Sequence, residues 1–240
     1  MSKMGFTVTQ SDVLNVMPKV TCSKEKSTII SKIKLVTYLT IKRVFDIVCS
    51  IIALVFLLPL ALIIKIAYLL TGDKESIFFI QNRIGQYGKE FKFYKFRTMV
   101  PNADEELKKL LDSNKELAKE YKLNKKLKHD PRITKMGKWL RKTSLDEFPQ
   151  FINVLFGQMA VIGNRPYLPR EKEDMVEYFD DIVKTRGGIV SYWAVMGRSD
   201  VSFETRLKLE KYYSNHRSLL LDIKIFFKTF KVVLGRRGSR

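Results

Sequence analysis

An uncharged apolar run from Ile47 to Ile64 constrains this chain more than any other feature. Its 18 residues read IVCSIIALVFLLPLALII. As a straight helix they would span about 27 Å, close to the thickness of the hydrocarbon core of a bilayer. No small-residue cleavage site of the signal-peptide type accompanies the run. The run therefore predicts a membrane helix, although a buried helix of a soluble protein is the alternative.

Pro59 and the basic flanks of this run bear on its topology. A proline inside a helix removes a backbone hydrogen bond and predicts a kink. Cations stand on both sides, with Lys42 and Arg43 before the run and Lys65 after it. The positive-inside tendency would hold both ends in the cytoplasm. We therefore expect residues 36–72 to form a re-entrant helix–break–helix that returns to the same face, with a tilted, kinked span as the alternative.

The charge of the chain points to anionic partners. Lysine and arginine total 44 against 25 acidic residues, a formal net charge of +19. Such a surplus suits nucleic acid, anionic lipid or phosphorylated substrates, and the apolar run favours membrane lipids. Two cysteines without a CxxC motif and only two histidines predict neither a disulfide framework nor a zinc site. A divalent metal would need oxygen ligands, which suits Mg²⁺.

The remaining sequence predicts an α/β fold that is mostly helical. Residues 1–35 are polar and rich in Ser, Thr and Lys, as expected of a flexible basic arm, and residues 73–240 would form a small catalytic domain. Ser76–Met99 resembles two short strands around a Gly85–Gly88 turn. Helices are expected over 102–122, from Pro149 through QFINVLFG, and over Glu171–Lys184.

The carboxy-terminal segment has apolar residues at helical spacing from Leu219 to Val233, with lysines elsewhere on the helical wheel. This pattern predicts a basic amphipathic helix. Such a helix can lie in the membrane surface or pack its apolar face on the core of the domain.

An acidic pair, Asp146 and Glu147, stands in the stretch TSLDEFPQF among many cations. One interpretation is an exposed helix start, in which Ser144 caps the helix and the acids favour its dipole. The other is chemistry on phosphate, because one carboxylate can attack phosphorus while the other holds Mg²⁺ or moves a proton. The guanidinium groups of the soluble part could bind two phosphate oxygens each, or simply form surface ion pairs.

Several blocks, taken in order, resemble the bacterial sugar transferase family. These are the monotopic phosphoglycosyl transferases that initiate glycan assembly on polyprenyl phosphate. The resemblance covers about Lys42 to Gly238. The blocks are KRVFDIV, the apolar run with Pro59, QNRIG, FYKFRTM, DPRITKMGKWLRKTSLDEFPQFINVLFGQMAVIGNRP and the WxVxGR of Trp193–Arg198.

The resemblance implies a mechanism and a location. Asp146 would attack the β-phosphate of a nucleoside-diphosphate sugar, usually a UDP-sugar, and polyprenyl phosphate would then take the sugar phosphate from Asp146. Glu147 would bind Mg²⁺ or assist the acceptor. The enzyme would lie on the cytoplasmic face of the bacterial inner membrane and would bind no nucleic acid. The resemblance is compatible with a homodimer but does not require one. The expected phosphate contacts are Lys95, Arg97, Arg141, Arg165, Pro166 and Arg198, with Glu210 as a further metal candidate.

The chain departs from the family pattern at several positions. Leu58 stands where a serine often precedes the proline, Asn164 changes the usual GPRP to GNRP, and Glu210 replaces a common Asp. The block Gly187–Arg198 is also altered, which puts the identity of the sugar in doubt. The alternative function is a non-catalytic, membrane-anchored module that binds anionic lipid or nucleic acid through its basic surface.

Overall fold

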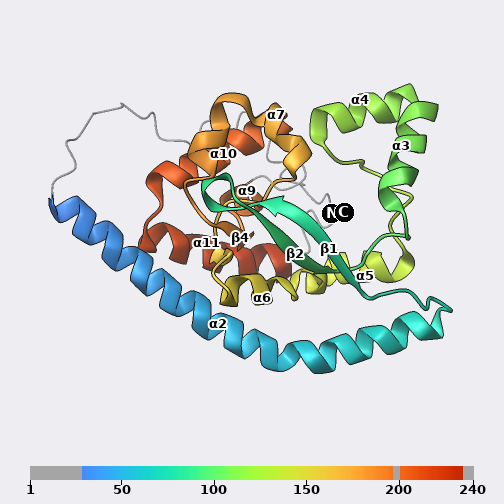
Figure 1. Cartoon of the computed structure of the whole chain (residues 1–240), viewed down its shortest axis with the longest axis horizontal. Helices are drawn as coiled ribbons and strands as arrows, with labels where there is room; N and C mark the ends of the chain where they lie inside the picture. The colour runs from blue at the N-terminus through green and yellow to red at the C-terminus, as the bar shows by residue number, and fades with distance from the viewer. Residues whose placement is uncertain (1–28, 197–200, 235–240) are drawn as a thin grey trace, which may run out of the picture.

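The computed structural model describes residues 29–196 and 201–234. Its longest element is α2 (Ile29–Leu70), a helix of 42 residues that would reach about 63 Å if it were straight. The helix bends in its middle, and its concave side faces the rest of the chain (Figure 1). The helical assignment continues through Pro59, so the expected break is absent and one bent helix replaces it. A single proline removes one hydrogen bond, which a bend accommodates without ending the helix.

The apolar side chains of α2 lie mostly outside the protein core. Leu58, next to the proline, is 81% exposed, and Val55, Phe56 and Ile63 are also exposed. Within the described residues, one helix, over Ser31–Leu70, is long and apolar enough to cross a membrane. Exposed apolar surface of this extent is typical of a membrane or protein interaction site.

The expected hairpin is confirmed. Strand β1 (Phe78–Ile84) pairs antiparallel with β2 (Glu90–Phe96), and Phe78 lies opposite Phe96. A single 3₁₀ turn, η1 (Gln86–Gly88), connects them. The positive φ of Gly88, 77°, explains the glycine at the end of this turn.

A second, parallel pair was not foreseen from the sequence. Strand β3 (Met159–Ile162) pairs with β4 (Gly187–Val190), and Met159 lies opposite Gly187. Added to Gly188, a Cβ atom would lie 2.1 Å from the backbone nitrogen of Gly163. The glycine therefore permits the close approach of these two segments.

The prediction of one helix over Glu171–Lys184 is wrong. The segment instead forms four short elements: η3 (Pro169–Glu171), α7 (Lys172–Met175), η4 (Val176–Tyr178) and α8 (Phe179–Ile182). Val176 has φ 41° and ψ −121°, a backbone conformation that a continuous α-helix does not contain. The chain therefore turns sharply where the apolar spacing alone suggested a regular helix.

The other expected helices are present. Residues 102–122 form α3 (Ala103–Ser113) and α4 (Lys115–Asn124), which are divided at Asn114 because its side chain caps α4. Pro149 precedes α6 (Gln150–Leu155), as expected. The remaining helices are α5 (Lys135–Thr143), η2 (Leu145–Glu147), α9 (Tyr192–Met196), α10 (Phe203–His216) and α11 (Leu219–Leu234).

Helix α11 packs on the core of the domain, as one of the two expectations for it required, whereas its contact with a membrane stays a prediction. Ile225 is buried in the main core, whereas Leu220 and Phe227 are exposed. One face therefore packs on the domain and another carries apolar side chains outward. Neither observation shows a membrane contact.

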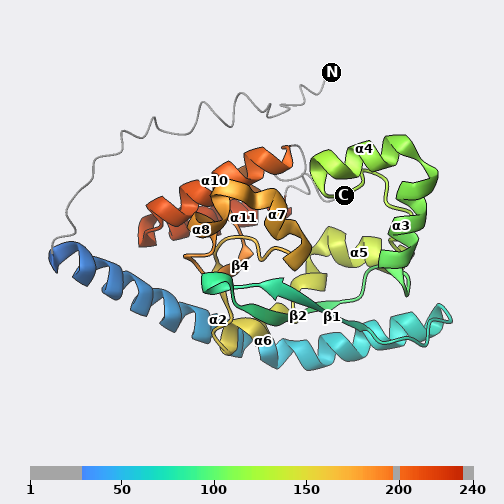
Figure 2. The ribbon, with the colours of Figure 1, turned by 45° about the horizontal axis from the view of Figure 1, so that its top comes forward.

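Two sets of contacts join α2 to the domain. Its second half packs Ile64 and Tyr68 against Phe96 and Leu140. Its first half is held by polar contacts, in which Arg43 donates to the carbonyls of Val154 and Leu155, at the end of α6, and Asp46 Oδ1 accepts from the Val161 amide at 2.8 Å. Figure 2 shows α2 along one side, next to α6 and the hairpin, with α5, α7 and α10 beyond them.

Candidate active site

The acidic pair lies in η2, directly after α5. Ser144 adopts a left-handed conformation, with φ 59°, where α5 ends, and its side chain makes no capping hydrogen bond. Asp146 is only 4% exposed, whereas the Glu147 side chain is 37% exposed. The interpretation as a solvent-exposed helix start capped by Ser144 is therefore wrong. A buried carboxylate needs a partner.

Lys95 supplies that partner from strand β2. Its Nζ atom lies 2.7 Å from Asp146 Oδ2 and 3.8 Å from Glu147 Oε1. The Lys95 side chain is itself only partly exposed. The structure thus brings together three residues that the sequence analysis selected, and it balances part of the negative charge of the pair.

Arg141 lies near the pair, in the last turn of α5. Its Nε donates to Thr98 Oγ1 at 3.0 Å. Burial lowers the pKa of its guanidinium, and the nearby carboxylates of Asp146 and Asp130 oppose that effect. Arg141 therefore acts electrostatically on Asp146, and it also lines a surface cavity.

This cavity is basic and has a volume of about 570 Å³. Its only acidic side chain, Asp130, is paired with Arg132 at 2.6 Å. Arg141 lines this cavity and links it to the carboxylate pair. The cavity is large enough for part of a nucleotide and is suited to negative charge. The lining residues are Lys128, His129, Asp130, Pro131, Ile133, Lys138, Arg141 and Lys142.

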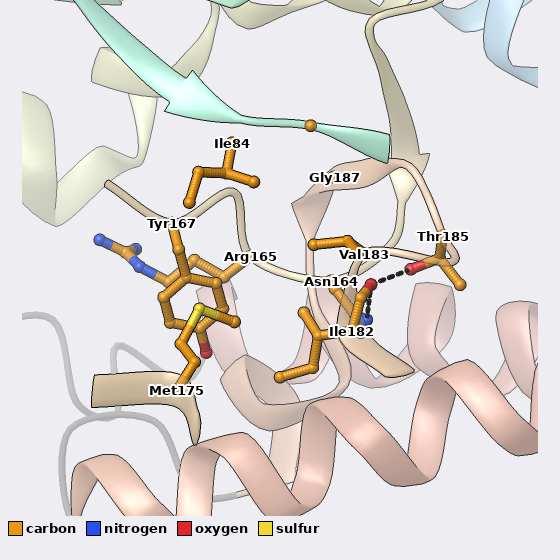
Figure 3. A pocket seen from close by; sticks show the side chains of 10 residues that line it. Ile84, Asn164, Arg165, Tyr167, Met175, Ile182, Val183, Thr185 and Gly187 are labelled. Carbon is orange, nitrogen blue, oxygen red and sulfur yellow. Dashed lines mark hydrogen bonds between the residues drawn. The ribbon is translucent and has the colours of Figure 1, made fainter. Parts of the chain in front are cut away.

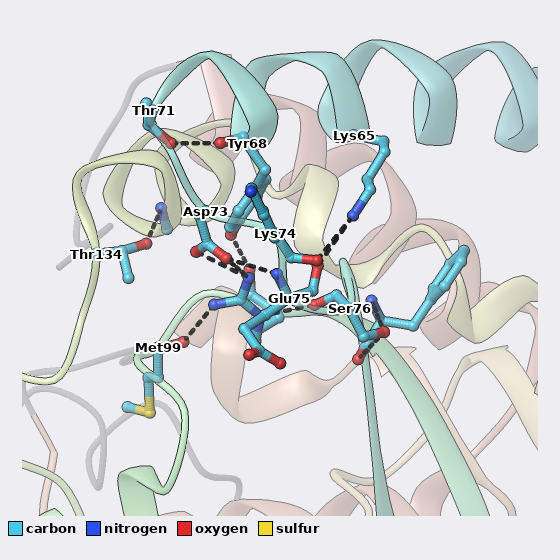
Figure 4. A network of polar contacts seen from close by, with 12 residues as sticks. Lys65, Tyr68, Thr71, Asp73, Lys74, Glu75, Ser76, Met99 and Thr134 are labelled. Atoms are coloured by element: carbon cyan, nitrogen blue, oxygen red, sulfur yellow. Dashed lines mark hydrogen bonds and ion pairs between the residues drawn. The ribbon is translucent and has the colours of Figure 1, made fainter.

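Arg97 has a different environment from the one expected of a free phosphate ligand. Its Nη2 atom lies 2.9 Å from both carboxylate oxygens of Asp73, and Nε donates to the Ser76 carbonyl at 2.7 Å. Its guanidinium also lies over the Tyr68 ring. Figure 4 shows this network of Asp73, Ser76 and their neighbours at the end of α2. Arg97 therefore joins α2 to the hairpin, and its role in phosphate binding stays a prediction.

The backbone amide of Arg165 contacts the side-chain carboxylate of Glu210. The Arg165 amide lies 3.2 Å from each carboxylate oxygen of Glu210, which is fully buried. Burial raises the pKa of Glu210 to about 8, against the opposing effects of this hydrogen bond and of Arg206. The neighbouring carbonyl of Pro166 accepts from Arg83 at 3.1 Å. Glu210 therefore shapes the loop that carries Arg165.

A cavity of about 10 Å³, with room for little more than water, lies behind this loop. Figure 3 shows the Arg165 side chain pointing away from Asn164 and Thr185, along the same side as Tyr167. The Asn164 side-chain amide donates to the Ile182 carbonyl and to Ser214 Oγ. Asn164 of the GNRP sequence therefore lies in the packed interior, where it lines this small cavity, and it does not line the basic cavity beside Arg141.

One buried arginine was missed by the sequence analysis. Arg206 is 4% exposed, and its guanidinium lies 4.5 Å from the Trp193 ring centre. Burial lowers its pKa, and neighbouring Arg165 acts in the same direction. Its sequence context, FETRLKLE, resembles the solvated face of a helix, so no local signal distinguished it. Arg198 lies outside the described residues.

The carboxylates present fit a magnesium ion that arrives with a diphosphate. In the described part of the chain no three Asp, Glu, His or Cys side chains gather as a ready-made metal site. Magnesium commonly uses one or two carboxylates together with substrate phosphates. The partly exposed Glu147 meets that requirement, whereas the oxygens of Glu210 face the Arg165 amide.

A buried carboxylate held by a lysine, beside a cation-lined cavity, is suited to an enzyme that acts on phosphate esters, and the long exposed apolar helix is suited to a membrane or protein surface. The comparison with protein families makes this class more specific. Residues 37–236 match the model described as bacterial sugar transferase, and the chain belongs to that family.

Named relatives support the assignment. The chain is 43% identical over 199 residues to the undecaprenyl-phosphate galactose phosphotransferase of Salmonella typhimurium, covering 83% of this chain and 41% of the relative. It is 40% identical over 202 residues to the exopolysaccharide production protein ExoY of Sinorhizobium fredii, covering 82% of this chain and 87% of the relative. It is 35% identical over 196 residues to the UDP-glucose:undecaprenyl-phosphate glucose-1-phosphate transferase of Klebsiella pneumoniae, covering 78% of this chain and 39% of the relative. The chain thus spans about two fifths of two of these proteins and most of the third.

Proposed function

We propose that this protein transfers a sugar 1-phosphate from a UDP-sugar to undecaprenyl phosphate through a covalent intermediate on Asp146. The observation that carries the proposal is the ion pair between Lys95 and Asp146 at 2.7 Å, beside the basic cavity. Family membership and the names of the relatives support the same reaction class. A non-catalytic binding module gains no support from them.

In the first step, Asp146 attacks the β-phosphorus of the donor. Lys95 engages Oδ2, which leaves Oδ1 for the attack. A bond forms between that oxygen and phosphorus, and the bond from phosphorus to the oxygen that bridges to the α-phosphate breaks. UMP leaves with the bridging oxygen. The sugar phosphate then remains on Asp146 as an acyl phosphate.

In the second step, an oxygen of undecaprenyl phosphate attacks the same phosphorus. The bond to Asp146 breaks, and the products are undecaprenyl diphosphate sugar and a free carboxylate. Lys95 and Arg141 offset the charge on the phosphoryl oxygens as it develops. Glu147 would hold Mg²⁺, which supplies further charge neutralisation when it is bound with the donor.

The test is intact mass spectrometry of the full chain. The purified protein is incubated with Mg²⁺ and, in separate samples, with UDP-galactose or UDP-glucose, whose sugars occur in the names of two of these relatives. We expect one donor to add the mass of a sugar phosphate, and undecaprenyl phosphate to remove it. Asp146→Asn should form no adduct, whereas Asp112→Asn, an exposed carboxylate on α3, should behave like the wild type. Turnover by Asp146→Asn at the wild-type rate would overturn the assignment of the nucleophile.

We further propose that α2 is re-entrant and leaves the domain on the cytoplasmic face of the inner membrane. The exposed apolar residues around its bend and the cations on both flanks support this topology. Single cysteines at positions within 35–40 and 75–80, in a chain without its native cysteines, should react from the same side of inverted membrane vesicles. Labelling from opposite sides would establish a simple crossing.

A further inference from the structure

A second basic cavity lies beside the first half of α2, away from the carboxylate pair. Its volume is about 460 Å³, and it is bounded by α2 from Leu35 to Asp46, by β3 and by the segment before β4. Leu145 and Phe148, which flank the carboxylate pair, pack against the cluster that contains Ile64 of the same helix. From Lys42 to Ile64 the helix extends about 33 Å. The two cavities are therefore separate sites.

Most polar groups of this second cavity are already engaged with protein. Lys42 forms an ion pair with Asp222 at 2.6 Å, and Arg43 donates to two carbonyls at the end of α6. Asp46 accepts from the Val161 amide. These contacts keep the wall of the cavity in place and leave it cationic.

Arg186 and Arg217 are the exceptions. Arg186 is half-buried, and within residues 29–196 and 201–234 it makes no hydrogen bond or ion pair. Arg217 has one long contact, 3.5 Å, to the Ser214 carbonyl. The Asp46 carboxylate on the same cavity attracts Arg186 electrostatically without a hydrogen bond, so the donors of this guanidinium remain available to the oxygens of a ligand. The two arginines therefore point to an anion.

One side of the cavity is apolar. Leu35 and Leu39 line it from α2, and both side chains are also partly exposed, at 41% and 43%. They continue into the exposed apolar residues of the same helix, such as Val36. A ligand that fills the cavity thus meets cations at one end and aliphatic surface at the other. A soluble phosphate would use only the first of these.

We propose that this cavity binds the phosphate headgroup of an anionic phospholipid. Arg186 and Arg217 contact the phosphate oxygens, and the acyl chains lie along Leu35 and Leu39. The bound lipid holds the first half of α2 at the bilayer surface and so sets the orientation of the domain. This site is independent of the chemistry at Asp146.

The experiment compares lipid retention by the full chain. The protein is incorporated into nanodiscs of phosphatidylcholine or of an equal mixture of phosphatidylcholine and phosphatidylglycerol, released, and measured by native mass spectrometry. We expect one phosphatidylglycerol to be retained in preference to phosphatidylcholine. Arg186→Gln should weaken its retention about fivefold, the effect of about 1 kcal/mol for one cation near an anionic surface, and Arg186→Lys should recover most of it.

Matched variants test both ends of the site. Lys109→Gln removes an exposed cation from α3 and should retain lipid like the wild type. Leu39→Ser should weaken the retention of phosphatidylglycerol but not the binding of inorganic phosphate. Circular dichroism and thermal unfolding verify that each variant is folded. Equal retention of phosphatidylglycerol by Arg186→Gln and the wild type, equal retention of the two lipids, or binding of inorganic phosphate without lipid preference would each overturn the proposal.

Discussion

Lys95 Nζ lies 2.7 Å from Asp146 Oδ2, although one residue belongs to a β-hairpin and the other to a 3₁₀ turn after α5. The hairpin therefore supplies the cation that accompanies the proposed nucleophile. A side-chain ammonium in this position can orient the carboxylate before attack and stabilise phosphoryl charge afterwards. The geometry makes Lys95 as important to test as the acidic pair.

Replacing Lys95 by methionine keeps an unbranched side chain of similar length and removes its charge. We expect kcat/KM for sugar-phosphate transfer to fall about 10²-fold, because the phosphoryl charge loses one fixed partner. Lys95→Arg should recover part of the activity. Lys92→Met, an exposed position on the same strand, is the control and should retain nearly full activity. Wild-type kcat/KM for Lys95→Met would remove Lys95 from the proposed mechanism.

The contact between Arg97 and Asp73 predicts a structural effect. Arg97→Lys loses the paired contact with the carboxylate, and we expect the free energy of unfolding to drop by about 2 kcal/mol. Asp73→Asn should have a similar effect, and the double variant should cost less than the sum of the two. The measurement is denaturant unfolding, together with KM for the donor. A raised KM at unchanged stability would instead identify Arg97 as a phosphate ligand.

Gly137 is required by the close approach of α5 to the chain after β2. A Cβ atom at this position would lie 1.9 Å from the Thr98 carbonyl oxygen. Gly137→Ala should therefore destabilise the protein by about 3 kcal/mol and displace Arg141, whose Nε contacts Thr98. Gly72→Ala is the control, because open space surrounds it and only its φ of 77° adds strain, about 1 kcal/mol. Equal unfolding free energies for the two variants would contradict the steric argument.

Asp222 joins α2 to α11 and α10. It accepts from Tyr38 Oη at 2.9 Å, Lys42 Nζ at 2.6 Å and Tyr213 Oη at 2.8 Å. Asp222→Ala leaves a largely buried lysine without its counter-ion, which should lower the free energy of unfolding by about 3 kcal/mol. Hydrogen exchange should increase around Tyr38 and Lys42. Asp222→Asn, which keeps an acceptor oxygen, should show a smaller change, and unchanged exchange in both variants would contradict this role.

The raised pKa of the buried Glu210 carboxyl predicts that the stability of the protein depends on pH. Burial raises its pKa from 4.5 to about 8, so between these values the folded protein binds more protons at this site than the unfolded chain does. The contribution of Glu210 to the free energy of unfolding therefore falls as pH rises through this window, by up to about 1.4 kcal/mol per pH unit, and is constant above it. Glu210→Gln should lack this dependence. The measurement is denaturant unfolding of both proteins across the window, and parallel pH profiles would contradict the prediction.

The successful structural predictions came from local patterns. Two short strand-like segments around a glycine turn predicted the β1–β2 hairpin, and helical spacing predicted α3, α4 and α11. The pair β3–β4 could not be predicted in this way. All four residues of β3 are buried, so the strand has no alternation of apolar and polar side chains, and its partner lies far along the chain. The prediction for the segment after Pro169 was wrong because the backbone conformation of Val176 interrupts the helix that the neighbouring residues favour.

By itself, the sequence determined the apolar helix, the acidic pair and the family resemblance, because each is written in residues that are neighbours along the chain. Only the tertiary structure decided the partners of the charged residues. Lys95 pairs with Asp146, and Arg97 pairs with Asp73. The Glu210 carboxylate accepts from the Arg165 amide. An ion pair depends on which segments cross in space and on how much water is excluded there. Neither quantity can be read from a charged residue and its immediate neighbours.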